Sequence, residues 1–148
     1  MIASTEGGRI TLTRGGVAQE FTVSVRNGNT RAYAGLHVAL QTEMMVGEGS
    51  SPTNGLVLER RDPATGAWRR ADLRVANDVY PHYLYPDGTP LARNASRVDR
   101  YRLSATNAGP TGSTSLLIRL VDTSAPQAAS ADEAAPRHAS LPVSVTRG

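Results

Sequence analysis

The chain of 148 residues is 39% hydrophobic and 20% charged, a composition typical of one soluble folded domain. It contains no cysteine, which excludes disulfides, thiolate zinc sites and a cysteine nucleophile. Sixteen basic residues, all of them arginine, stand against thirteen acids, and the net charge of +3 is too small to suggest nucleic-acid binding.

Apolar and polar residues alternate in several short segments, which places apolar side chains on one face of a β-strand. Residues 9–13, 20–26 and 33–42 are the first three predicted strands. Residues 56–61 and 68–73 flank the sequence Asp-Pro-Ala-Thr-Gly, and a proline early and a glycine late in such a connection predict a hairpin turn.

The second half of the chain continues the pattern after an interruption. Pro81 and Pro86 break a strand-like stretch, so we expect residues 77–90 to form an edge strand or an extended loop. Residues 98–106, 115–122 and 140–146 are the last predicted strands. No run of about 18 apolar residues occurs, so no membrane span is predicted.

Two stretches do not alternate, and we expect both to be flexible. They are the N-terminal residues 1–8 and the Ala- and Pro-rich excursion 123–139. The remainder predicts eight or nine strands in a single domain, residues 1–148, and an all-β, antiparallel two-sheet sandwich. Its interior should bring together Phe21, Val38, Ile118 and Val143.

Several sequence motifs resemble one family of domains. These are Phe-Thr-Val-Ser-Val at 21–25, Arg-Asp-Pro-Ala-Thr-Gly at 61–66, Tyr-Arg-Leu at 101–103 and Leu-Pro-Val-Ser-Val-Thr at 141–146. Together they resemble an immunoglobulin-like domain of Streptomyces-type actinobacterial secreted or cell-wall-associated proteins. The resemblance implies an immunoglobulin-like sandwich in an extracellular or cell-envelope protein, although no leader pattern is visible in this chain, and it carries over no catalytic residue.

Three of the five tyrosines lie within residues 80–85, which makes this stretch a candidate ligand site. The candidate residues are Tyr80, His82, Tyr83 and Tyr85. Tyrosine rings offer flat apolar area with a hydroxyl, which suits stacking on a sugar or contact with a peptide. If the stretch is extended, Tyr83 and Tyr85 share a face; the alternative is that the rings cover the end of the sandwich.

A second candidate site is formed by arginines of the predicted hairpin. They are Arg60, Arg61, Arg69, Arg70 and Arg74. Guanidinium groups bind phosphate and carboxylate, so the cluster could hold a polyanion. Neighbouring Glu59, Asp62 and Asp72 partly neutralise it, and the simpler interpretation is a solvated strand face that discourages edge pairing.

The three histidines do not suggest catalysis or metal binding. Alternation directs His37 away from the apolar face, and His138 lies in the excursion, so both should face solvent. No histidine spacing predicts a zinc site, and no Gly-x-Ser-x-Gly motif is present. A hydrolase built around His82 with Asp78 or Asp87 is the least favoured hypothesis.

We therefore expect a non-catalytic extracellular or cell-envelope module that acts as a structural spacer or a protein-interaction domain. Its partners would be neighbouring domains or envelope components. The alternative is a carbohydrate- or peptide-binding module that uses the tyrosines of residues 80–85. No cofactor and no metal are predicted.

Overall fold

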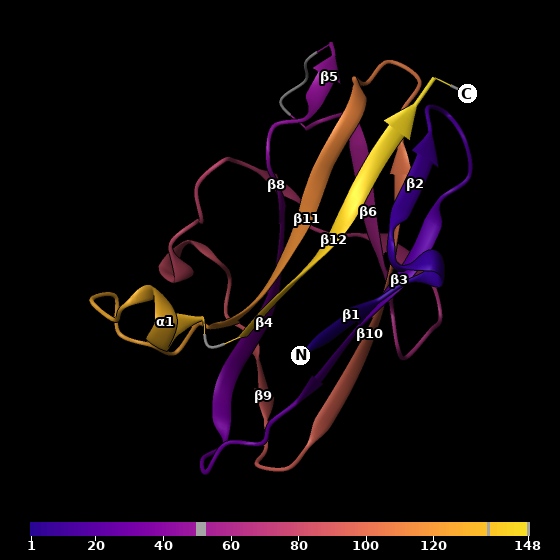
Figure 1. The fold of residues 1–148 in the computed structure, drawn as a ribbon. Helices are drawn as coiled ribbons and strands as arrows, with labels where there is room; N and C mark the ends of the chain where they lie inside the picture. Colours follow the sequence, from indigo (N-terminus) through magenta and orange to yellow (C-terminus); the bar gives the residue numbers. More distant parts are fainter. Residues whose placement is uncertain (50–52, 136, 148) are drawn as a thin grey trace.

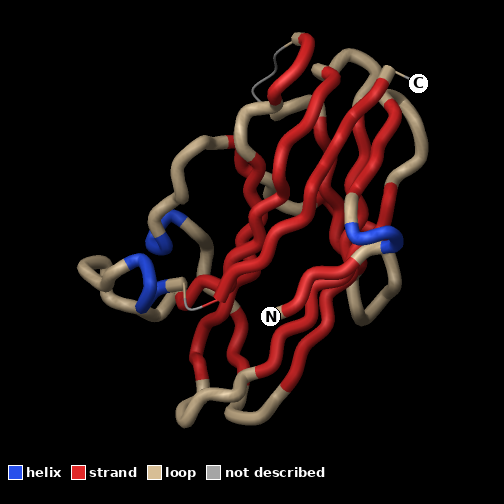
Figure 2. Tube along the Cα trace, in the orientation of Figure 1, coloured by secondary structure: helices blue, strands red, loops and turns tan. Residues whose placement is uncertain are grey.

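Alternating apolar residues form the strands of two β-sheets that pack face to face (Figures 1 and 2). The computed structural model describes residues 1–49, 53–135 and 137–147. Within them, helix is confined to the short segments η1 (Glu6–Gly8), η2 (His82–Leu84) and α1 (Ala131–Ala134). The predicted fold class, an all-β two-sheet sandwich, is confirmed. No helix in the described ranges is long and apolar enough to cross a bilayer.

The five-stranded sheet consists of antiparallel neighbours. Its order is β1 (Ile2–Ser4), β3 (Gln19–Arg26), β10 (Ser96–Ala105), β6 (Leu56–Arg61) and β7 (Trp68–Arg70). The predicted hairpin joins β6 to β7, with Arg60 opposite Arg69. This sheet therefore ends on one side at the short strand β7.

The seven-stranded sheet is built around two long strands. Its order is β2 (Ile10–Thr13), β12 (Arg137–Thr146), β11 (Thr111–Asp122), β4 (Tyr33–Thr42) and β8 (Arg74–Val75), while β5 (Val46–Glu48) pairs with β11 and β9 (Thr89–Leu91) pairs with β4. The pairs β2–β12 and β4–β8 are parallel, and every other pair is antiparallel. The strands exceed the eight or nine expected because short edge segments form pairs that alternation does not reveal.

The interior lies between the two sheets and contains the four residues that the sequence places there. Phe21 comes from the five-stranded sheet, while Val38, Ile118 and Val143 come from the other, and all four are at most 7% exposed. Phe21 stacks on Tyr101 of the neighbouring strand, with ring centroids 5.3 Å apart. Burial of these apolar faces is the main contribution to stability.

The N-terminal residues 1–8, which the sequence predicts to be flexible, contain a short paired strand and side-chain hydrogen bonds. β1 pairs with β3, with Ala3 opposite Val23. The side chain of Gln19 donates to the Thr5 hydroxyl at 2.9 Å and to the Arg9 carbonyl at 2.8 Å. Low alternation failed as a guide here because backbone and side-chain hydrogen bonds hold the segment against the edge of the sheet.

The excursion at residues 123–139 also differs from the expectation. Its described part contains α1, and Ala134 is 1% exposed. β12 begins at Arg137 rather than at residue 140, because β11 continues as its partner as far as Leu120. His138 is exposed, as expected, whereas residue 136 lies outside the described residues.

The outer face of β4 and β11 is covered by the chain rather than by solvent. Ala39 and Val121 on this face pack with Tyr85, and all three are buried. Arg119, between them, is 7% exposed and donates to the Tyr80 carbonyl at 3.0 Å. The segment that contains η2 therefore closes a second, small apolar cluster.

Replacing a fully buried residue of the main interior should be costly. We expect Ile118→Ala to lower the free energy of unfolding by about 3 kcal/mol, because apolar burial is lost and a cavity remains. Val98→Ala, at a position that is 62% exposed, should change it by less than about 0.5 kcal/mol. Urea denaturation of the two variants checks this, and equal effects would contradict the assigned interior.

Candidate ligand-binding groove

The edge of β4 that faces away from β11 is only partly occupied by other strands. β9 pairs with Tyr33 and Leu36 of β4, and β8 pairs with Gln41 and Thr42. Between them, no strand of the described chain lies beside residues 37–40 on this side. A gap of four residues is therefore left in the edge of the sheet.

Two residues of β4, Val38 and Leu40, direct their backbone groups into this gap, as the hydrogen bonds of other residues in the same strand show. The Thr42 carbonyl accepts from Ala76, on the β8 side, whereas the Gly35 carbonyl accepts from Thr123, on the β11 side. Backbone groups of successive residues in a strand point to alternate sides. The N–H and C=O groups of Val38 and Leu40 consequently face the gap, which resembles the free edge of an incomplete sheet.

A groove lies along this gap, between β4 and the strands β6 and β10 of the other sheet. It consists of two adjoining hollows, of about 390 and 160 Å³, that share His37, Val38, Arg60 and Tyr101. Charged residues line both hollows, namely Arg60, Arg69, Arg70 and Arg97 together with Asp62, Asp72, Asp87 and Asp99. Four arginines and four aspartates give the lining a formal charge of zero while His37 is neutral.

The floor of the groove holds a buried ion cluster. Asp99 is 5% exposed, and its carboxylate lies 2.6 Å from Arg60 Nη2 and 3.2 Å from Arg97 Nε. Burial opposes the charge of Arg60, but the hydrogen bond and the charge of Asp99 outweigh it and raise the pKa of Arg60. Burial, reinforced by Asp99, raises the pKa of Tyr101 to about 12. The floor is thus a fixed charged surface with a neutral phenol.

His37 stands where the groove meets the covered outer face of β4. Its ring centroid lies 5.3 Å from that of Tyr85, and the residue is half-buried rather than facing solvent as expected. Burial lowers the pKa of His37, with nearby Asp72 acting in the opposite direction. The imidazole is therefore neutral at neutral pH and offers both a donor and an acceptor.

The hairpin between β6 and β7 forms the rim. The Asp62 carboxylate accepts the backbone N–H of Ala64 at 2.8 Å, and Gly66, at φ 74°, closes the turn. That hydrogen bond lowers the pKa of Asp62, and Arg69 Nε, at 3.4 Å, acts in the same direction. The turn sequence thus holds one of the rim arginines in place.

The five arginines of the predicted polyanion site do not form one surface. Arg60, Arg69 and Arg70 line the groove, whereas Arg61 does not. Arg74 lies elsewhere: its guanidinium is 4.1 Å from the ring centroid of Tyr85 and 4.8 Å from that of Tyr80. The strand pleat separates Arg61 from Arg60, and the acids of the groove balance the charge of the arginines that line it.

The four aromatic candidates of residues 80–85 are also separated. η2 curls the stretch, so Tyr83 is 50% exposed while Tyr85 is 7% exposed, and the two do not share a face. Tyr80 and Tyr85 contact Arg74, whereas His82 is 5% exposed and its Nε2 lies 2.9 Å from the Pro126 carbonyl. These contacts give His82 a structural role and favour the interpretation of Tyr85 as a covering side chain.

Several groove residues were missed in the sequence, although one signal for them exists. In residues 98–106, every second residue points inward, namely Tyr101, Leu103 and Ala105, and Asp99 belongs to the same inward-pointing series. A carboxylate at an inward position must be paired or lie at the open side of the sandwich. That reasoning identifies Asp99, but it does not reveal Arg60 or Arg97 as its partners. In the described ranges, no group of three or more His, Asp or Glu side chains is placed to hold a metal ion.

Comparison with known proteins gives similarity of fold. No family model and no curated protein matches the chain. Among solved structures, the chain is similar to AvmM, which catalyses macrocyclization in alchivemycin A biosynthesis, with 14% identity, a TM-score of 0.55 and coverage of 97% of this chain and 88% of AvmM. The likeness extends over nearly the whole of both chains.

Two further solved structures show weaker similarity. SSP-19 of Caenorhabditis elegans, an MSP-domain protein like family member, has 13% identity and a TM-score of 0.42, with 99% of each chain covered. A family 123 glycoside hydrolase from Clostridium perfringens has 10% identity and a TM-score of 0.43, with 93% of this chain and 22% of the hydrolase covered.

The buried phenol of Tyr101 should make stability depend on alkaline pH. Its pKa of about 12 exceeds the ordinary 10, so the folded state favours the neutral form. This contribution is complete below pH 10 and is lost as the pH rises towards 12. Between pH 9 and 11.5, the wild type should lose about 2 kcal/mol more free energy of unfolding than Tyr101→Phe. Urea denaturation at both pH values measures the difference, and parallel losses would contradict the burial of the hydroxyl.

Proposed function

We propose that the domain is a non-catalytic protein-interaction module that binds an extended peptide segment along the free edge of β4. The observation that carries this proposal is the four-residue gap between β8 and β9, where Val38 and Leu40 direct their backbone groups into the groove. An added strand would take up these groups through main-chain hydrogen bonds. The partner would be a neighbouring domain or an envelope component.

The charges of the groove support a peptide over a polyanion. Arginines and aspartates are equal in number along the lining, and Asp99 is already shared by two arginines. Such a lining repels neither sign of charge and offers donors and acceptors to alternating side chains of a peptide. A linear polyanion would place some of its charges against the four aspartates.

The non-catalytic role is supported by the contacts of two groups that could act as acid or base, Asp99 and His82. The carboxylate of Asp99 is held by two arginines, and the His82 imidazole is held by a backbone carbonyl. An extracellular or envelope location is supported by the resemblance of the strand and hairpin motifs to secreted actinobacterial domains. AvmM, which is similar in fold, is an enzyme. A small-molecule substrate in the same groove would bind without main-chain pairing. Binding of a peptide strand and binding of a small molecule therefore give different results when peptide amides are methylated.

The test uses peptides selected from a random library by display on phage. We expect a selected peptide to shift the amide signals of Val38 and Leu40 and to slow their hydrogen exchange. N-methylation of alternate peptide residues should abolish binding in one register and leave it intact in the other, because only every second amide of a strand faces its neighbour. Loss from methylation at every position, or at none, would contradict strand addition.

A variant at the rim should weaken the same peptide without disturbing the fold. We expect Arg69→Ala to raise Kd about five- to tenfold, because a rim ion pair contributes roughly 1 kcal/mol. Arg9→Ala, an exposed arginine outside the groove, is the matched control and should leave Kd unchanged. Titration with chitotetraose tests the alternative glycan site, which is favoured if signals of Tyr83 and Leu84 move while those of Val38 and Leu40 do not.

A further inference from the structure

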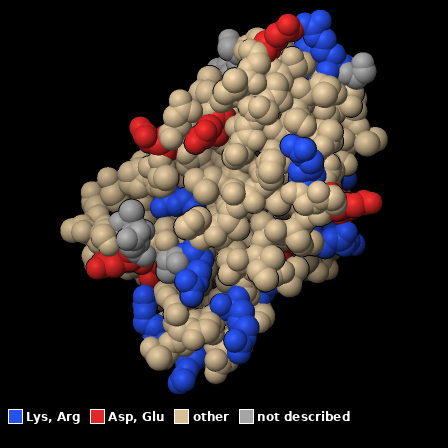
Figure 3. Space-filling view, in the orientation of Figure 1, with Lys and Arg blue, Asp and Glu red and all other residues tan. Residues whose placement is uncertain are grey.

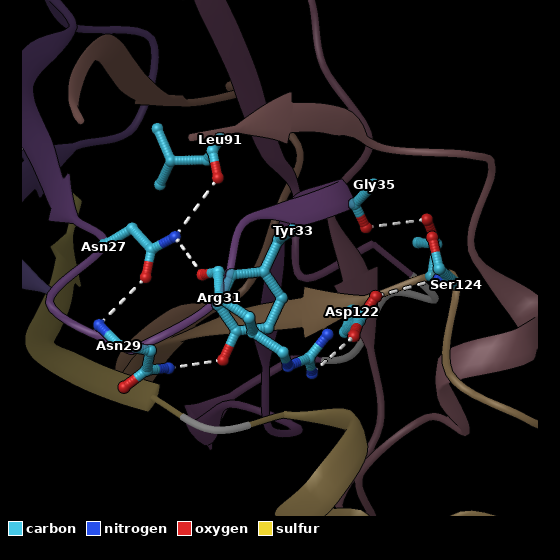
Figure 4. Close-up of polar contacts among 9 residues, drawn as sticks. Asn27, Asn29, Arg31, Tyr33, Gly35, Leu91, Asp122 and Ser124 are labelled. Atoms are coloured by element: carbon cyan, nitrogen blue, oxygen red, sulfur yellow. Dashed lines mark hydrogen bonds and ion pairs between the residues drawn. The ribbon is translucent and has the colours of Figure 1, made fainter. Parts of the chain in front are cut away.

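A second charged surface lies at the end of the sandwich where β3 turns into β4. Two loops are tied together there by Asn27, which is 3% exposed. Its side-chain amide donates to the carbonyls of Arg31 at 2.9 Å and Leu91 at 3.2 Å, and its side-chain oxygen accepts the Asn29 N–H at 3.0 Å (Figure 4). The Asn94 N–H donates to the Asn27 carbonyl at 2.8 Å, so the loop of residues 92–95 is fixed beside residues 27–32.

Tyr33 and Asp122 complete this framework. The Asn29 side-chain amide donates to the Tyr33 hydroxyl, and the guanidinium of Arg31 lies 4.3 Å from the centroid of the Tyr33 ring. Arg31 also reaches Asp122 at 3.4 Å, while the other Asp122 oxygen accepts the Ser124 N–H at 3.0 Å (Figure 4). Among the described residues, Asp122 is thus an acid at this end that is 4% exposed and already engaged.

Three further arginines converge on the same end from separate parts of the chain. Arg26 and Arg137 line one crevice of about 30 Å³ together with Tyr33 and residues 27–29. Arg93 precedes Asn94 in the adjoining loop. All three are exposed, and none of their side chains forms a hydrogen bond or ion pair with the described part of the chain. In Figure 3, basic side chains gather towards this lower end of the molecule, whereas the upper part of the face carries both acidic and basic side chains.

We propose that this basic end, defined by Arg26, Arg31, Arg93 and Arg137, binds a flexible polymer that carries repeated phosphate groups. Guanidinium groups match phosphate through paired N–H donors, and the side chains of Arg26, Arg93 and Arg137, unlike that of Arg31, give up no ion pair with the described residues on binding. Val25, Leu36, Leu91 and Leu120 also line the crevice, so the phosphate groups would contact the arginines at its rim rather than its interior. This inference concerns a surface other than the groove and does not depend on peptide binding there.

The same geometry disfavours nucleic acid as the ligand. Binding of single strands relies on aromatic rings that stack on the bases. The ring of Tyr33 is 7% exposed and covered by Arg31, so it is not free to stack on a base. Repeated phosphates on a slender chain fit the surface better.

The test measures binding of linear inorganic polyphosphate by the whole chain. We expect the triple variant Arg26→Ser, Arg93→Ser, Arg137→Ser to lose about tenfold or more in affinity at roughly 50 mM salt, and to show a shallower dependence of affinity on salt concentration. The matched control is Arg61→Ser, Arg69→Ser, Arg70→Ser, which removes the same charge from the hairpin and should change affinity less than about twofold. Circular dichroism of both triple variants establishes that they fold.

Each other outcome overturns the proposal. Equal losses in the two triple variants would mean attraction by net charge alone, and a larger loss in the control would place the polymer on the hairpin. Tighter binding of single-stranded DNA than of polyphosphate of equal charge would reverse the assigned ligand class. Binding to phosphatidylglycerol vesicles without binding to polyphosphate would identify a lipid surface instead.

Discussion

The contact between the apolar faces of the two sheets is the interaction on which the rest of the structure depends. Residues such as Phe21, Leu103, Leu116 and Ile118 are removed almost completely from solvent by the opposite sheet. Because both sheets must present their apolar rows to the same interior, the position of every strand is constrained. Polar side chains at inward positions can then lie only where the sheets separate, and this is where Asp99 and the Tyr101 hydroxyl line the groove.

Buried charge is tolerated in this sandwich because each carboxylate is paired in place. Asp99 is shared by Arg60 and Arg97, and Asp122 is held by Arg31 and by the backbone of Ser124. Removing a carboxylate from water is costly unless opposite charge and hydrogen bonds replace the solvent. Both carboxylates lie near the margins of the interior, where strands end or gaps occur, and they fix the surfaces proposed for ligand binding.

The two proposed surfaces differ in how they would attract a ligand. The groove is balanced in charge and offers the backbone of an incomplete sheet edge, which suits a partner of defined conformation. At the basic end, Arg31 is paired with Asp122, whereas the side chains of Arg26, Arg93 and Arg137 form no ion pair with the described residues; this surface suits a partner defined mainly by its own charge. A single domain could therefore contact a protein neighbour and an anionic polymer at the same time, through elements that the sandwich holds rigidly.

The sequence by itself determined the fold class, most strands and the hairpin, because a period of two is a local property and the Asp-Pro-Ala-Thr-Gly turn acts through its own backbone. It indicated correctly that Phe21, Val38, Ile118 and Val143 share an interior. The tertiary structure alone decided the pairing of residues 1–8, the curl at His82–Leu84 and the separation of Arg61 and Arg74 from the arginines of the groove. These features depend on which distant segments become neighbours. β4 pairs with β8 and β9, and Arg26 and Arg137 line the same crevice. Contacts between segments so far apart in the sequence leave no periodic pattern in it.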